Sequence, residues 1–183
     1  MSNAHERRFR GDPERLRSPE RTALLEPDRV VALSLTGLAA ASVLDVGTGS
    51  GFFAEMFSRA GSIVTGLDVS GVSLDVARGH APGIDFVEGV AEALPFEDGS
   101  FDLVFMAHVL HESDEPLMAL REARRVASRR VVVVEWPFED EEHGPPLAHR
   151  LRPEKMERLA RDAGLVGLER LRLSHMDLYR MSP

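Results

Sequence analysis

Hydrophobic residues gather in short continuous runs along the chain, separated by stretches in which they recur every three or four positions. The run at residues 131–134 consists of valines, and three further runs are apolar nearly throughout. Strands of this kind are typical of a mainly parallel sheet that is covered on both faces. Strands are expected at residues 42–46, 62–69, 84–89, 101–110 and 130–136, with two final strands in 165–181 that form a hairpin around Ser174.

The stretches between the strands have the period of amphipathic helices. Ser113 or Asp114 is the expected N-cap of the helix that precedes the fifth strand. The alternation predicts an α/β fold: a Rossmann-like, doubly wound, mostly parallel seven-stranded sheet with helices on both faces and a C-terminal antiparallel strand. Helices are expected from Asp28 to near Gly37 and at residues 52–61, 71–80, 113–128 and 152–164.

Composition divides the chain into two parts. Residues 1–28 are polar, rich in arginine and interrupted by prolines, which predicts an arm or lid with short helical turns. Residues 1–4 are interpreted as a cloning remnant. Residues 29–183 are expected to form a single domain. No signal peptide or membrane-spanning run is recognised, so a cytoplasmic location is expected.

Charge and cysteine content limit the chemistry. The net charge is −8, which argues against a nucleic-acid partner because phosphate binding needs a basic face. The absence of cysteine excludes disulfides, thiolate nucleophiles and cysteine–zinc sites. The HVLHE segment at residues 108–112 matches neither zinc-protease motif, so no metal ion is expected.

The strongest chemical signal is DVGTGSG at residues 45–51, between a strand and a helix. A phosphate-binding P-loop would need a lysine followed by serine or threonine after the last glycine, but two phenylalanines follow here. The dinucleotide motif G-x-G-x-x-G fails in both registers, because Phe52 and Ala54 stand where the third glycine is needed. The remaining pattern is an aspartate followed by three alternating glycines.

This pattern resembles the first motif of the class I S-adenosylmethionine-dependent methyltransferases. A second segment, GVAEALPF at 89–96 followed by DGSFD at 98–102, is similar to the methyltransferase type 11 group, which includes C-methyltransferases of ubiquinone and menaquinone synthesis. The resemblance implies S-adenosyl-L-methionine as cofactor, S-adenosyl-L-homocysteine as product and a small-molecule acceptor. The cofactor-binding residues are then expected to be Asp45, Gly47, Thr48, Gly49, Ser50, Gly51, Asp68, Val69, Val90, Ala91, Glu92, Met106 and Ala107.

Three of these residues have specific expected roles. Asp45 either balances the ammonium group of the cofactor or organises the turn, and Asp68 accepts hydrogen bonds from the ribose hydroxyls. Val90 stands where the family usually has an aspartate that accepts from the adenine amino group. Adenine is therefore expected to be held by apolar contact, by backbone around Ala91 or by Glu92.

Catalytic candidates follow from the rule that doubly wound sheets bind ligands beyond the carboxyl ends of their strands. His108 lies at the end of the fourth strand, Glu135 at the end of the fifth, and His111 opens a loop. In-line methyl displacement depends mainly on proximity and alignment, and a base is needed only when the acceptor must lose a proton. Simple packing is the alternative for His108, and a solvated loop for His111. Asp102 lies at the opposite end and is expected to be structural.

Three functions remain open at this point. The first is methyl transfer to a small acceptor bound between the arm at 5–28 and the loop at 137–152. The second is a non-catalytic module that binds S-adenosylmethionine or S-adenosylhomocysteine, which Val90 motivates. The third is an NAD-dependent oxidoreductase.

Overall fold

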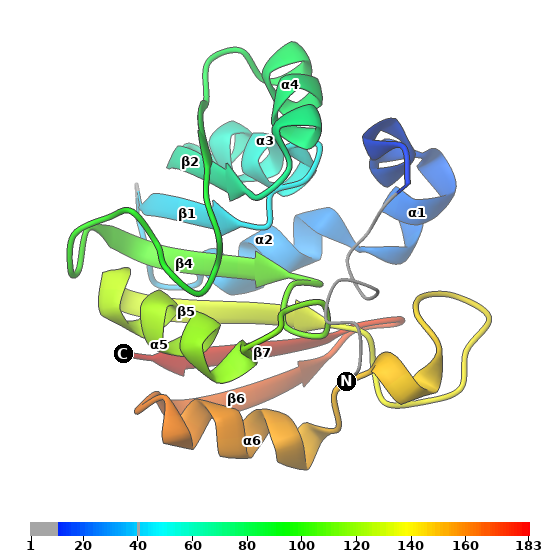
Figure 1. The fold of residues 1–183 in the computed structure, drawn as a ribbon, viewed down its shortest axis with the longest axis vertical. Helices are drawn as coiled ribbons and strands as arrows, with labels where there is room; N and C mark the ends of the chain where they lie inside the picture. Colours follow the sequence, from blue (N-terminus) through cyan, green and yellow to red (C-terminus); the bar gives the residue numbers. More distant parts are fainter. Residues whose placement is uncertain (1–10, 40) are drawn as a thin grey trace.

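A seven-stranded sheet forms the centre of the molecule, in the order β3-β2-β1-β4-β5-β7-β6 (Figure 1). The computed structural model describes residues 11–183 except Ala40. Strands β1 to β5 are parallel, and β7 runs antiparallel between β5 and β6. The predicted fold, including the antiparallel end of the sheet, is confirmed. The strands are β1 (Ser42–Val46), β2 (Ile63–Asp68), β3 (Asp85–Glu88), β4 (Phe101–Ala107), β5 (Ala127–Glu135), β6 (Val166–Arg172) and β7 (Asp177–Ser182).

Helices cover both faces of the sheet. Helices α2, α3 and α4 contribute to one apolar core, and α5 and α6 cover the opposite face, which is turned toward the viewer in Figure 1. Two short helices, η2 and α1, belong to the N-terminal arm. The helices are η2 (Pro13–Arg17), α1 (Pro19–Leu24), α2 (Pro27–Leu35), α3 (Phe52–Arg59), α4 (Gly71–His80), α5 (Pro116–Val126), η3 (Leu147–His149) and α6 (Pro153–Asp162).

Strand β5, an inner strand of the sheet, shows why its sequence has no polar alternation. Val132 and Val134 pack into the core beneath α2 and α3, whereas Val131 and Val133 pack beneath α5 and α6. All four valines are completely buried. A strand covered on both faces needs apolar side chains at every position.

Several predicted boundaries are wrong, among them the start of β5, which lies at Ala127 rather than at residue 130. Strand β4 ends at Ala107 rather than at residue 110, because His108 has a φ of 62° and leaves the extended conformation. Helix α5 begins at Pro116 with Glu115 as N-cap, not Ser113 or Asp114. The Ser113 hydroxyl donates instead to Glu92.

The outer strand β6 is irregular and charged. Its register against β7 shifts between Val166 and Glu169, where Gly167 has a φ of 63°. Glu169, Arg170 and Arg172 are exposed along it. None of the helices in the described residues has the length and apolar composition that a bilayer crossing requires.

Asp102 has the structural position expected from the sequence. Its carboxylate accepts hydrogen bonds from the backbone N–H of Ser42 at 2.9 Å and from the Ser42 hydroxyl at 3.1 Å. The start of β1 is thereby fixed to the start of β4, at the edge of the sheet opposite the carboxyl ends of the parallel strands.

Candidate functional site

A cavity of about 910 Å³ lies beyond the carboxyl ends of the parallel strands. Its volume is in the range of small-molecule and cofactor pockets. Leu16 and Arg21 of the N-terminal arm line it, as do Gly144 and Pro145 of the loop after β5. The sequence-predicted residues in its wall are Gly47, Gly49, Asp68, Val69, Val90, Ala91, Glu92, Ala107, His108 and His111.

The turn after β1 presents bare backbone to this cavity. Gly47, Gly49 and Gly51 have φ values of 69°, 55° and 74°, a region that favours glycine. A Cβ atom on Gly47 would lie 2.4 Å from Val109 Cγ2, and one on Gly49 would lie 2.9 Å from Leu16 Cδ1. The conformation therefore favours glycine at both positions, and the Val109 side chain also leaves no space for a Cβ atom at Gly47.

Asp45 lies behind this turn rather than in the cavity wall. It is 2% exposed, and its Oδ2 accepts the Thr48 hydroxyl at 2.7 Å. Burial raises the pKa of Asp45 to about 7, with a smaller contribution from the charge of Asp68. Of the two roles expected for Asp45, the geometry supports organisation of the turn. Thr48, Ser50, Gly51 and Met106 are likewise buried and do not line the cavity in the described structure.

Asp68 connects the end of β2 to the glycine turn. Its Oδ2 accepts the backbone N–H of Gly49 at 2.8 Å, and its Oδ1 accepts that of Ser70 at 2.9 Å. Ser70 is the N-cap of α4, and its hydroxyl accepts the backbone N–H of Ser73. The Asp68 carboxylate therefore lies at the cavity with its orientation set from two sides.

The segment after β3 forms another side of the cavity. Val90 is 38% exposed and leaves an apolar surface there. The carboxylate of Glu92, beside it, accepts a hydrogen bond from the Ser113 hydroxyl. This segment thus combines an apolar surface with one oriented carboxylate.

His108 lies at the polar end of the cavity and has an unusual environment. Its backbone N–H donates to the carbonyl of Val134 at 2.8 Å, and its ring stacks on Trp136 with centroids 5.0 Å apart. Neither ring nitrogen has a hydrogen-bond partner among the described residues. Burial, then the charges of Arg21 and His111, lower the pKa of His108 well below its ordinary value, so the ring is neutral.

His111 forms a buried pair with Glu135. Its Nδ1 lies 2.7 Å from Glu135 Oε2, while Glu135 Oε1 accepts the backbone N–H groups of Leu110 and His111. Burial lowers the pKa of His111, but the charge and hydrogen bond of Glu135, together with the charge of Glu112, outweigh it. The net effect raises the pKa, so His111 holds its proton more tightly than a free histidine.

The N-terminal arm is fastened to the glycine turn. Arg17 donates from Nη1 to Glu55 at 2.8 Å and from Nε to the carbonyl of Ser50 at 3.1 Å. Arg21, on α1, is half-buried and lines the cavity. Sequence reasoning missed Leu16 and Arg21, because nothing distinguishes them from the arm's other residues. The first ten residues of the arm, with the interpreted cloning remnant, lie outside the described residues.

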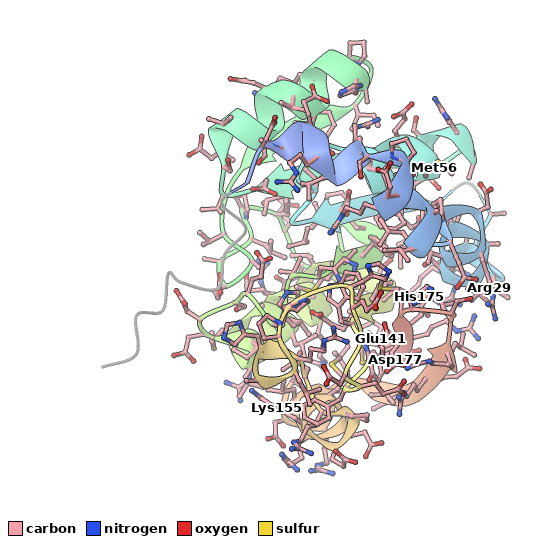
Figure 2. The ribbon with its side chains drawn as sticks, turned by 90° about the vertical axis from the view of Figure 1, so that its right-hand side faces the viewer. Arg29, Met56, Glu141, Lys155, His175 and Asp177 are labelled. Carbon is pink, nitrogen blue, oxygen red and sulfur yellow. The ribbon has the colours of Figure 1, made fainter. Side chains whose placement is uncertain are left out.

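The loop after β5 is held around one buried arginine. Arg150 donates to the carbonyl groups of Pro137, Glu139, His143 and Pro145. Glu141 Oε2 of this loop lies 3.6 Å from His175 Nδ1, in the turn between β6 and β7 (Figure 2). The loop is therefore ordered over the cavity, although its sequence predicts only an irregular segment.

Known proteins are similar to this chain in sequence and in fold. Residues 44–134 match the family model described as "Methyltransferase domain". The demethylmenaquinone methyltransferase of Renibacterium salmoninarum is 38% identical over 117 residues, which are 64% of this chain and 49% of that protein. The ubiquinone/menaquinone biosynthesis C-methyltransferase of Hahella chejuensis is 39% identical over 110 residues, 54% of this chain and 44% of that protein. The chain thus spans about half the length of these relatives.

Solved structures extend the similarity to nearly the whole chain. A SAM-dependent methyltransferase from Aquifex aeolicus has a TM-score of 0.82 and 25% identity, and covers 94% of this chain and 99% of its own. The (4+2)-cyclase SpnF has a TM-score of 0.70 and 27% identity, over 88% of this chain and 64% of its own.

The strand order and the cavity beyond the carboxyl ends define a Rossmann-like methyltransferase fold. The chain belongs to the S-adenosylmethionine-dependent methyltransferases, with a type 11 methyltransferase domain. S-adenosylmethionine is the cosubstrate that this membership implies. The oxidoreductase alternative is left without support.

Proposed function

We propose that this chain binds S-adenosylmethionine in the cavity and directs its methyl group to a small-molecule acceptor. The observation that carries the proposal is the glycine turn beside Asp68. Bare backbone at Gly47 and Gly49 faces the cavity, and the Asp68 carboxylate lies next to it. A compact amino-acid tail needs close approach to backbone, and ribose hydroxyls need a carboxylate acceptor.

The remaining contacts are assigned by chemistry. Gly47 and Gly49 would hold the amino-acid tail, Asp68 the ribose, and Val90 with Ala91 the adenine ring through apolar contact. Asp45 contributes indirectly, because its bond to Thr48 fixes the turn. Gly47, Gly49, Asp68, Val90 and Ala91 follow three neighbouring strands of the sheet and line one cavity.

When bound, S-adenosylmethionine supplies an electrophilic methyl group on a sulfonium. The chain's own residues position the acceptor and keep water out, which is where most of the acceleration of such a displacement arises. We place the polar group of the acceptor at the end of the cavity lined by His108 and His111; Glu135, bonded to His111, does not line the cavity itself. Neutral His108 offers it an unused lone pair, while the Glu135–His111 pair fixes the segment that carries both histidines.

The acceptor is inferred to be small and partly apolar. The names of the relatives indicate varied acceptors, from demethylmenaquinone to a malonyl group on an acyl-carrier protein in the Erwinia pyrifoliae relative. In this chain, Trp136 and Pro145, the latter within the loop after β5, line the same cavity as the two histidines. That combination suits an aromatic or short-chain molecule with one polar group.

Calorimetry with S-adenosylmethionine and S-adenosylhomocysteine tests the binding half of the proposal. Asp68→Asn is expected to weaken affinity roughly tenfold or more, because a charged acceptor for two hydroxyls is lost. Asp75→Asn, on the exposed side of α4, is the matched control. Unchanged affinity in Asp68→Asn would overturn the assignment.

Turnover tests the other half. S-adenosylhomocysteine release is measured with quinols, phenols and short-chain acids as acceptors. Binding without turnover across this panel would favour the non-catalytic module. Two observations motivate this test: Val90 stands where the family usually has an aspartate, and a cyclase has the same fold. Binding of NAD without binding of S-adenosylmethionine would overturn the proposal as a whole.

A further inference from the structure

Three metal-ligating side chains converge at the polar end of the cavity. His108 follows β4, His111 lies in the loop after it, and Glu135 ends β5. One ligand atom from each residue lies within 4.8 Å of the other two, and all three side chains are buried. The sequence predicts no metal ion there, because the spacing of HVLHE matches neither zinc-protease motif; Glu135 comes from another strand and could not be placed beside it.

His108 is the residue that the protein itself does not explain. It is 9% exposed, and neither of its ring nitrogens has a hydrogen-bond partner in the described part of the chain. Buried polar atoms are nearly always partnered, so each exception needs a reason. The backbone of His108 is also held in the left-handed region, which costs free energy in a residue other than glycine and is typical of functional positions.

We propose that His108, His111 and Glu135 bind a divalent transition-metal ion of the zinc or iron(II) class at this end of the cavity. Two imidazoles and one carboxylate are a donor set that these ions take while keeping open coordination positions. His111 Nδ1 and Glu135 Oε2, now 2.7 Å apart, are joined by a hydrogen bond through one proton. The metal replaces that proton, and the two atoms move apart to the spacing of about 3 to 3.5 Å set by bonds of roughly 2.1 Å.

The charges around the three ligands are compatible with a cation. Glu135 and Glu112 are negative, and Glu112 Oε1 lies 3.8 Å from His111 Nε2. The guanidinium of Arg21 lines the same cavity. With both histidines neutral, these groups leave one net negative charge for a divalent ion to compensate.

The open positions of the ion face the cavity, so an oxygen or nitrogen atom of the acceptor becomes the next ligand. This link to the acceptor rests on the proposed function, whereas the metal site itself does not.

The test is a titration of the tag-free full chain with cobalt(II), in which binding is detected by the visible d–d absorption of the ion. Calorimetry with zinc(II) measures the affinity and the stoichiometry. One equivalent of cobalt(II) is expected to bind and to give d–d bands that indicate a low coordination number. His108→Ala, which loses no hydrogen bond, and Glu135→Gln, which keeps an acceptor for the two backbone N–H groups, should each weaken binding by about tenfold to a hundredfold or more. His80→Ala removes a surface histidine paired with Glu14 and should change nothing.

Two results would overturn the proposal. One is the absence of cobalt bands in the wild-type chain. The other is metal binding that survives both His108→Ala and Glu135→Gln, which indicates an adventitious surface site. Circular dichroism on each variant verifies folding, and S-adenosylmethionine calorimetry on the same samples reads the proposed function separately. A chain that binds S-adenosylmethionine but no metal ion contradicts the metal site alone, and a chain that binds the metal ion but no S-adenosylmethionine contradicts the proposed function alone.

Discussion

Asp45 shows that a residue in a ligand-binding motif can act on the fold instead of the ligand. Its carboxyl is buried behind the glycine turn and accepts the Thr48 hydroxyl. Desolvation of this carboxyl disfavours its charged form and raises its pKa to about 7. The turn therefore holds a proton that an exposed aspartate would have lost.

Asp45 gives the stability of the protein a particular pH dependence. Between the ordinary pKa of 3.8 and about 7, the unfolded carboxyl has lost its proton but the folded one keeps it. Unfolding then releases a proton, so stability falls as pH rises through this window, by about 4 kcal/mol at about 1.4 kcal/mol per pKa unit. In Asp45→Asn the free energy of unfolding should not fall in this way. Urea unfolding at a series of pH values from 4 to 8 measures it.

Asp102→Asn provides a control of opposite sign. Hydrogen bonds from the Ser42 N–H and hydroxyl lower the pKa of Asp102, so its contribution to stability is present above the unfolded pKa and is lost as pH falls. Identical pH profiles for Asp45→Asn and the wild type would contradict the assignment to Asp45.

The sequence predicts cavity residues well where a strand ends and less well within the turn. Gly47, Gly49 and Asp68 follow from the rule for doubly wound sheets. Thr48 and Ser50 alternate with the glycines and are buried away from the cavity, which a motif alone does not reveal. The pairing of His111 with Glu135 joins residues from two elements, so it depends on the register of β4 and β5.

At the level of elements, the sequence predicts the helices and strands because their periodicity is strong, but not the loop after β5. Prolines and charged residues in this loop indicate irregular structure without indicating order. The order comes from the buried guanidinium of Arg150 and from Gly144, which packs flat against Trp136. Both are long-range relations that no local pattern encodes.

Arg150→Lys is expected to loosen this loop. A lysine ammonium cannot reproduce the fork that reaches four carbonyl groups, so some of them lose their donor, at about 1 to 3 kcal/mol for an unsatisfied buried group. Limited proteolysis within residues 138–149 should become faster. Arg161→Lys, on the exposed side of α6, is the control. Equal cleavage rates in the two variants would contradict a fastening role for Arg150.

At the scale of the whole molecule, two segments outside the sheet border the cavity. The N-terminal arm covers the glycine turn through Leu16 and Arg17, and the loop after β5 covers the histidines. The sequence predicts both segments as coverings of the site. It does not predict that Arg17 would fasten the arm to α3, because the partner Glu55 lies 38 positions away.

Arg17→Met is expected to free the arm without unfolding the domain. The side chains of Arg17 and Glu55 are 15% and 19% exposed, so their ion pair is partly shielded from water. Its loss should raise the dissociation rate of S-adenosylmethionine several-fold, since affinity changes at a covered site appear mainly as dissociation. Stopped-flow displacement measures the rate, and Arg15→Met, on the exposed side of η2, is the control. Faster hydrogen exchange of the arm with an unchanged dissociation rate would show that the arm does not retain the ligand.

The irregular strand β6 also affects how copies of the protein meet each other. An outer strand offers unpaired backbone groups to any passing chain, and long flat apolar ones lead to aggregation. Here the bend at Gly167 interrupts the row of backbone groups, and pairing with a second molecule would require removing water from Glu169, Arg170 and Arg172. On the far side, β3 is only four residues long. Both outer strands are therefore poor templates for pairing with a second molecule, which disfavours aggregation at high protein concentration.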